Sequence, residues 1–225
     1  MARFANVALV PHGVGWAEKK LSLYLEIPLL GCDDAAATIS FKSRSFMKRV
    51  FMDASMNIPL GAHDIHTSED MLIALSRLIA TNLDIKVWQI RLNVDFNNES
   101  LVTLDLSKLP VVDTLRKEQA RLLGMNRNNP AAWFSKQVQF NVRKRLVDAL
   151  NGPDFFNALT IYRKDIYFNW DYYCKLLNQY GGVVEAEPLQ RIGTVLGLCF
   201  VDPSGEIQVF DGVEVVNEGP NTSQQ

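Results

Sequence analysis

The chain has 225 residues, of which 48% are hydrophobic and 21% are charged. This composition supports a folded domain with a core and excludes disorder or a fibrous repeat as the main state. Because 23 Lys and Arg face 25 Asp and Glu, the net charge is -2, so we expect neither nucleic acid nor an anionic membrane surface as a partner.

Cysteine content and hydropathy bear on the location of the protein. The cysteines Cys32, Cys174 and Cys199 are odd in number and widely spaced, which argues against a disulfide framework and against a zinc site. No apolar stretch approaches the length of about 20 residues needed to cross a bilayer. A reduced, cytoplasmic location is therefore expected.

The N-terminal part alternates short apolar runs with helical segments. The pattern predicts a strand over 6–10, a helix over 16–25, a second apolar strand over 27–31 and a helix that begins at Ala35 after two acidic residues suited to an N-cap. We assign 1–61 to an N-terminal α/β segment.

A cationic helix closes this segment. Four apolar residues at helical spacing share the run 42–51 with four cations, Lys42, Arg44, Lys48 and Arg49. The stretch 57–61, which contains Pro59 and Gly61, then breaks the helix.

A helix and a hairpin follow. Thr67 begins an N-cap signature, and apolar residues from Met71 to Ile79 mark one face of an amphipathic helix that fades near Asn82. Residues 86–92 and 101–106 alternate polar and apolar side chains around an Asn-Asn turn, which predicts an antiparallel hairpin.

The segment 111–180 is helical in character, and strands follow it. Apolar residues recur every four positions from Phe134 to Leu150, and a second helical stretch ends at Gly181. Strand patterns return over 183–184, 192–201 and 207–210, and the polar tail 217–225 is expected to fray.

The cations of 42–51 have two interpretations. Positive side chains beside a helix start can hold a phosphate together with the exposed backbone N–H groups. They can also form the solvated face of a helix that packs on its other side, and spacing alone favours that simpler alternative. His12, His63 and His66 form no metal-binding pattern, and the P-loop, dinucleotide and esterase motifs are absent.

The helix over 133–150 carries the beginning of a calmodulin-binding IQ motif. Val138, Gln139 and Arg143 have the apolar, glutamine and cation order of that motif, but Asp148 stands where a second cation is required. We therefore do not expect calmodulin as a partner and interpret the helix as a core element with a basic face.

Several segments taken in order resemble one family. They are Lys42-Ser43-Arg44-Ser45, Lys48-Arg49-Val50-Phe51, the stretch Ile58 to Ile65, Trp88-Gln89-Ile90-Arg91, and Gly181-Gly182-Val183-Val184-Glu185-Ala186-Glu187-Pro188. Together they are similar to the ATP-grasp-like region of the IQ domain-containing protein H family, over about Asn6 to Val216. The Gly-Gly segment is the most specific of them.

The resemblance implies a mixed α/β fold of ATP-grasp type. A helix and an antiparallel hairpin would form a lid over a nucleotide held against a second mixed sheet. The ATP-grasp-like region would span 62–216, with 111–180 as a helical insertion. ATP is the one cofactor implied, and none is established from the residues themselves.

The resemblance also implies site residues. Lys48 or Lys42 would be the first cation on the phosphates, Arg91 stands where the family has a lid-strand lysine, and Glu185 lies in the hinge that contacts adenosine. Arg91 keeps the charge with a different shape. The hairpin loop 95–100 lacks the family's glycines and contains two acids, which disfavour a triphosphate.

These departures point to a non-catalytic module. Its expected role is that of a structural or protein-interaction component, with axonemal or microtubule-associated protein partners in a cilium or sperm flagellum, a location that comes from the resemblance. The alternatives are an ATP-dependent carboxylate-amine ligase and a nucleotide-binding switch. An exposed part of the aromatic-rich stretch 162–180 would suit partner binding, whereas a core role for these aromatics is the competing interpretation.

Overall fold

A computed structural model describes residues 7–11, 14–31, 42–94, 99–125, 130–188, 195–201 and 204–214. The chain divides into two compact units, Met1–Glu187 and Pro188–Gln225. Each unit is described by itself. The helix expected from Ala35, the hairpin turn at 97–98 and the tail 217–225 lie outside the described residues.

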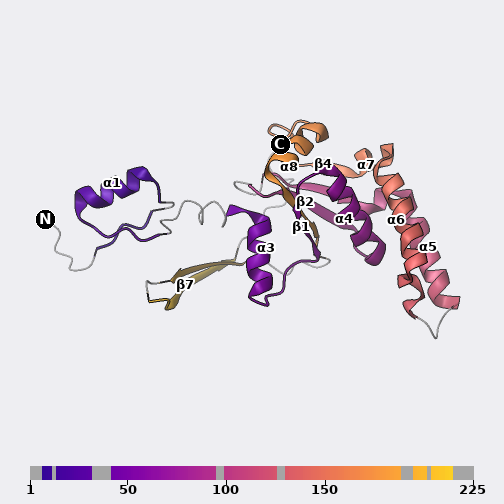
Figure 1. Ribbon diagram of the computed structural model, residues 1–225, viewed down its shortest axis with the longest axis horizontal. Coiled ribbons are helices and arrows are strands. Elements are labelled where there is room, and N and C mark those ends of the chain that lie inside the picture. Colours follow the sequence, from indigo (N-terminus) through magenta and orange to yellow (C-terminus); the bar gives the residue numbers. More distant parts are fainter. Residues whose placement is uncertain are drawn as a thin grey trace, which may run out of the picture. The chain divides into compact units, whose positions relative to one another are not determined.

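The first unit is built on a five-stranded sheet in the order β1-β5-β2-β3-β4 (Figure 1). Its strands are β1 (Gly61–Ile65), β2 (Val87–Leu92), β3 (Val102–Asp105), β4 (Leu159–Ile161) and β5 (Gly182–Ala186). Every neighbouring pair is antiparallel. The predicted hairpin is confirmed as β2 and β3, and it forms the centre of the sheet together with β5.

The strand register gives the sheet two chemically different faces. Trp88, Ile90 and Val184 point to one face and are fully buried. Gln89 pairs with Glu185 on the other face, and Arg91 lies two residues further along the same strand. Because side chains alternate along a strand, one face enters the apolar core and the other presents polar groups.

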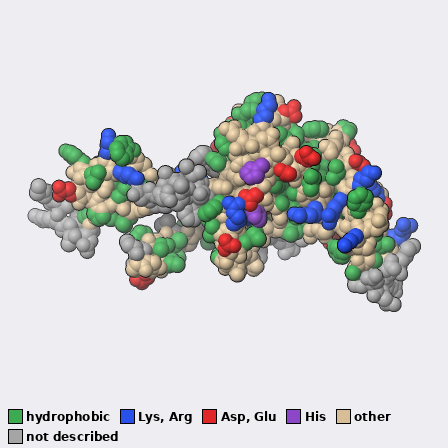
Figure 2. Space-filling view, in the orientation of Figure 1, with side chains coloured by type: hydrophobic (Ala, Val, Ile, Leu, Met, Phe, Trp, Pro, Cys, Tyr) green, Lys and Arg blue, Asp and Glu red, His purple; other side chains and the backbone are tan. Residues whose placement is uncertain are grey.

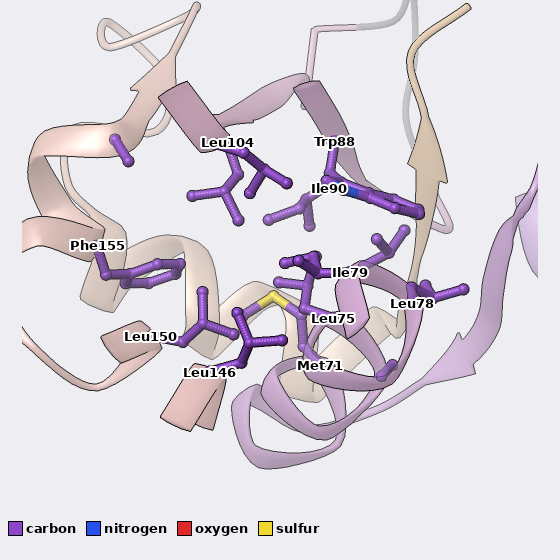
Figure 3. Close-up of a cluster of buried hydrophobic side chains, with 14 of the residues drawn as sticks. Met71, Leu75, Leu78, Ile79, Trp88, Ile90, Leu104, Leu146, Leu150 and Phe155 are labelled. Atoms are coloured by element: carbon purple, nitrogen blue, oxygen red, sulfur yellow. The ribbon is translucent and has the colours of Figure 1, made fainter. Parts of the chain in front are cut away.

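The apolar face packs against helices. The α4 helix (Ser68–Thr81) directs Met71, Leu75 and Ile79 toward the sheet, and α6 (Lys136–Leu150) adds Leu146 and Leu150 (Figure 3). The α4 helix begins at Thr67, whose side chain accepts a hydrogen bond from the Asp70 backbone N–H at 3.0 Å. This N-cap and the apolar stripe confirm the predicted helix.

The remaining helices of the segment 111–180 surround this core. They are α5 (Pro110–Met125), the short 3-10 helix η3 (Pro130–Phe134), α7 (Pro153–Ala158) and α8 (Trp170–Tyr180), and a further 3-10 turn, η2 (Leu106–Lys108), precedes them. The purely helical interpretation of this segment is wrong at one place, because Leu159–Ile161 forms β4 against β3. Three residues are too few for a period-2 pattern to be recognised.

The α3 helix (Arg44–Asp53) contacts β1 and β5. Its N-cap is Ser43, whose hydroxyl accepts a hydrogen bond from the Phe46 backbone N–H at 3.4 Å. The helix predicted from the apolar stripe is therefore confirmed. The strand that follows, β1, was not expected, because Gly61 and Pro59 were interpreted only as breakers.

The N-terminal segment contains α1 (Trp16–Leu25), confirming that helix. The flanking apolar runs form a single parallel bridge between Leu9 and Leu29 rather than strands, within 7–11 and 14–31. Glu18 accepts a hydrogen bond from the Gly15 backbone N–H at 2.9 Å and so caps α1.

The second unit is an antiparallel pair, β6 (Val195–Val201) and β7 (Ile207–Glu214). The register shifts between Leu198 and Cys199. A mixed α/β fold with a second, small sheet is thus confirmed, and the described strands of this second sheet are antiparallel. Among the described helices, none combines the length and the apolar character needed to cross a membrane.

Candidate functional site

A cavity of about 410 Å³ lies between α3 and β5. Its lining is Lys42, Ser43, Arg44, Met47, Lys48, Phe51 and Glu185. Three of the four residues expected at a nucleotide site, Lys42, Lys48 and Glu185, therefore meet in one place, although Glu185 is far from the others in sequence. Three cations face one carboxylate, and Met47 and Phe51 add an apolar wall.

The central feature of this cavity is an ion pair between Lys48 and Glu185. The two side chains retain only 16% and 15% of their exposure. A partly buried carboxylate beside an ammonium neutralises it locally, and both charges lose water. One of the two lysines expected on the phosphates, Lys48, is thus bound to the carboxylate that was expected to contact adenosine.

A second cavity, of about 260 Å³, adjoins this ion pair. Lys48 and Glu185 line both cavities. The rest of the second lining is mainly apolar and comprises Met52, Ile58, Pro59, Leu60, Gly61, Ala62, His63 and Val184. The ion pair is therefore common to a cavity with a cationic lining and a cavity with a mainly apolar lining.

Arg91 does not line either cavity. Its guanidinium donates a hydrogen bond to the Gln89 side-chain oxygen at 3.0 Å. Gln89 in turn pairs across the strands with Glu185. Arg91 is thus on the same sheet face as the candidate site, but the structure does not bring it into the cavity with Lys48.

A buried hydrogen-bond network fixes the start of α3 on the sheet. The Asn93 side-chain oxygen accepts from the Ser45 backbone N–H at 3.0 Å and from the Ser45 hydroxyl at 2.7 Å. The Asn93 amide donates to the Tyr180 carbonyl at 3.1 Å, and the Asp64 backbone N–H donates to the Ser45 hydroxyl at 2.9 Å. This network holds α3, β1 and the end of β2 together.

Sequence reasoning did not identify this network. Ser45 belongs to the quoted Lys-Ser-Arg-Ser segment, but nothing in its spacing connects it to Asn93. Ser45 is 1% and Asn93 6% exposed. Polar residues buried to this degree need partners, and only their burial reveals the role.

A second ion pair attaches α3 to β1. Arg49 binds Asp64, and this hydrogen bond raises the pKa of the Arg49 guanidinium. His63 Nε2 lies 3.7 Å from the Asp64 carboxylate. Both Arg49 and Asp64 are largely exposed, so the pair orients α3 more than it stabilises the fold.

The acid that closes the hairpin loop is engaged by an arginine. Arg163 binds Glu99 and also Asp165, the latter at 2.6 Å. These two carboxylates raise the pKa of Arg163, and Arg163 lowers the pKa of Asp165. Glu99 is therefore held at the end of the loop, which ties β3 to the segment after β4.

The two histidines in the described part of the chain, His63 and His66, lie at different places. His63 lines the second cavity, and His66 lies beside Gly181. Across the parts of the chain that the structure describes, no three His, Cys, Asp or Glu side chains cluster in a way that could hold a metal ion.

The aromatic-rich stretch 162–180 is divided between core and surface. Tyr167 and Tyr173 are buried, at 8% and 0% exposure, whereas Tyr162 and Phe168 are 51% and 62% exposed. Phe168 stacks on Tyr172 with ring centres 4.3 Å apart. The core interpretation therefore holds for one part and the surface interpretation for the other.

The IQ-like helix directs its glutamine inward. Gln139 is 6% exposed, and its amide donates to the Trp133 carbonyl at 3.0 Å. Val142, Leu146 and Leu150 on the same helix are also buried. A partner that wraps this helix would have to remove it from the core.

A family model and a sequence relative both place the chain in the same family. A family model described as "IQCH-like, ATP-grasp" matches residues 35–219. IQ motif-containing protein H from Danio rerio is 24% identical over 185 residues, which are 81% of this chain and 17% of that protein. The chain thus spans about a sixth of the length of this relative. No solved structure matches. Because the family model covers most of the chain and the described fold is mixed α/β, the chain belongs to the IQCH-like ATP-grasp family.

Proposed function

We propose that this chain is a non-catalytic ATP-grasp-like module that serves as a structural or protein-interaction component. The observation that carries the proposal is the ion pair between Lys48 and Glu185. A phosphate would have to compete with a carboxylate that already holds the lysine. Lys48 is therefore already paired within the protein.

Arg91 supports the same proposal. Its guanidinium donates to Gln89 and does not line the cavity that contains Lys48. In a phosphoryl-transfer site the cations converge on the transferring group. Here Lys42 and Lys48 line the cavity, but Lys48 is bound to Glu185 and Arg91 is bound to Gln89 outside it.

Thermal unfolding with and without Mg-ATP tests this function. A ligand that binds only the native state adds about 2.7 kcal/mol to the free energy of unfolding when its concentration is a hundred times the dissociation constant. The unfolding midpoint then rises. We expect no phosphate release at millimolar Mg-ATP. Steady release that depends on Lys48 and survives in Lys86→Ala, an exposed lysine outside the cavity, would overturn the proposal.

A nucleotide-binding switch is the second candidate, and the cavity of about 410 Å³ favours it. Lys42 and Arg44 supply cationic lining beyond Lys48, and Phe51 offers an apolar surface to a base. Binding would move Lys48 from Glu185 to a phosphate. A raised midpoint without phosphate release, lost in Lys48→Ala, would favour this candidate over a purely structural module.

The cellular setting is part of the proposal. The similarity to IQ motif-containing protein H supports a search among axonemal or microtubule-associated proteins of a cilium or sperm flagellum. Imaging of the tagged chain in ciliated cells tests this setting. A distribution that excludes the axoneme would contradict it. The ligase alternative is tested separately, by turnover of Mg-ATP.

A further inference from the structure

A third cavity lies away from the candidate site, where α5, η3 and α6 meet. It measures about 270 Å³. Leu122, Trp133, Val138 and Val142 form its apolar part, and Glu118, Arg121, Asn141 and Arg145 form its polar part. We call this lining the α5–α6 groove. The groove shares no lining residue with the two cavities beside the ion pair of Lys48 and Glu185.

The floor of the α5–α6 groove is held rigidly. The Trp133 indole N–H donates to the Ala80 carbonyl at 3.0 Å, and the Trp133 carbonyl accepts from the Gln139 amide at 3.0 Å. Trp133 is 2% exposed. A floor fixed in this way is preorganised, so a ligand does not have to order it on binding.

The helices around the groove are strongly basic. Over the ranges of α5 and α6, seven Lys and Arg face three Asp and Glu, a net charge of +4, although the whole chain carries -2. Figure 2 shows Lys and Arg side chains gathered over this helical region. The charge of the molecule is therefore unevenly distributed, and two of these cations, Arg121 and Arg145, line the apolar hollow.

We propose that the α5–α6 groove binds an acidic protein segment that carries an apolar side chain. The apolar side chain would enter the hollow above Trp133 and Val142, and flanking carboxylates would contact Arg121 and Arg145. Complementary charge provides the long-range attraction and the apolar anchor provides the short-range selectivity.

The ion pair across the groove fits an exchange of partners. Arg145 binds Glu118 at 2.7 Å, and both side chains are about 40% exposed. A carboxylate of the incoming segment can replace Glu118, because an exposed pair costs little to break. A polyphosphate backbone has no apolar group for the hollow. A protein segment is thus a better match than nucleic acid.

Two fluorescein-labelled acidic peptides of equal length and charge test the proposal. One is glutamate-rich with a central leucine, and the other has serine in place of the leucine. Their binding to the full chain is followed by fluorescence anisotropy at low and at physiological ionic strength. We expect the leucine peptide to bind more tightly, and its affinity to fall with added salt.

A matched pair of variants locates the site. Arg121→Glu and Arg143→Glu make the same charge change at exposed positions of the two helices, but only Arg121 lines the groove. We expect Arg121→Glu to weaken the leucine peptide about tenfold and Arg143→Glu less than about threefold. Circular dichroism confirms that both variants are folded.

Several outcomes would overturn the proposal. Equal losses in the two variants would mean attraction by overall charge without a groove. Equal affinity for the leucine and serine peptides would show that the apolar hollow does not contribute to binding. No measurable binding of either peptide would show that the groove does not bind an acidic segment. Tighter binding of a DNA duplex than of the leucine peptide would assign this surface to nucleic acid instead.

Discussion

Ser45 and Asn93 are joined by two hydrogen bonds, at 3.0 Å to the Ser45 backbone N–H and at 2.7 Å to its hydroxyl. Ser45 lies in the first turn of α3, one turn before Lys48, and Asn93 follows β2 directly. The pair therefore sets where α3 begins relative to the sheet. Because Lys42, Arg44 and Lys48 all belong to or adjoin this helix, the pair also places the cations of the candidate site.

Replacement of Asn93 tests the importance of this attachment. Asn93→Ala removes the acceptor of the Ser45 backbone N–H and the donor to the Tyr180 carbonyl, and a buried group left without its partner costs about 1–3 kcal/mol. We expect a clear loss in the free energy of unfolding measured in urea. Asn141→Ala, at an exposed helix position, is the control and should change stability by less than about 0.5 kcal/mol.

Gly181, in the turn between α8 and β5, has a backbone conformation that predicts a loss of stability on substitution. Gly181 has φ 69° and ψ 177°, a region open almost only to glycine. A Cβ there would lie 2.7 Å from the Asn93 amide nitrogen. We expect Gly181→Ala to destabilise the protein by about 1–3 kcal/mol.

Gly124 is the matched control for this change. It lies inside α5, and a Cβ at this position meets nothing within 4 Å. Gly124→Ala should stabilise the protein by about 0.5–1 kcal/mol, since alanine is the better helix former. Urea unfolding of the two variants should therefore shift in opposite directions. An unchanged or raised urea midpoint for Gly181→Ala would refute the assigned role of Gly181.

The ion pair of the candidate site predicts non-additive effects. Either Lys48→Met or Glu185→Gln leaves one charge that is mostly removed from water, at a cost of about 1–3 kcal/mol. The double variant leaves neither charge. We expect its loss to be smaller than the sum of the single losses by about 1 kcal/mol, measured by a double-mutant cycle. Additive losses would show that the two side chains do not interact in solution.

Local signals were sufficient for several elements of the fold. The α4 helix has both a cap at Thr67 and an apolar stripe, and β2 and β3 alternate over enough residues to be recognised. By contrast, β1 contains Gly61, His63 and Asp64 and has no alternation. It becomes a strand because it pairs with β5, whose partner residues lie far away in the sequence.

The candidate site was predictable only through the family resemblance. The cations of α3 have the spacing of an ordinary solvated helix face, and nothing local connects Lys48 to Glu185. The ion pair results from the packing of α3 on β5. For Arg91, the sequence pattern predicts the strand correctly but does not predict the position of the side chain, which binds Gln89 and stays outside the cavity.

The thiol of Cys174 provides a prediction about pH. Burial, and then the negative charge of Asp171, raise the Cys174 pKa from 9.0 to about 11. The thiolate is the reactive form, so alkylation of Cys174 by iodoacetamide should be slow at pH 8 and should increase until about pH 11. In a Cys32→Ser background, the exposed Cys199 should react first, as peptide mass spectrometry can show.

The same shift predicts how stability depends on pH. A neutral thiol is favoured in the folded state, whose pKa is the higher one, so its contribution is complete below pH 9 and is lost as the pH rises from 9 toward 11. Cys174→Ser, which does not ionise in this range, should remove this part of the decline in urea unfolding measured at several pH values. An identical decline in both proteins, or equal alkylation of Cys174 and Cys199 at pH 8, would contradict the burial of this side chain beside Asp171.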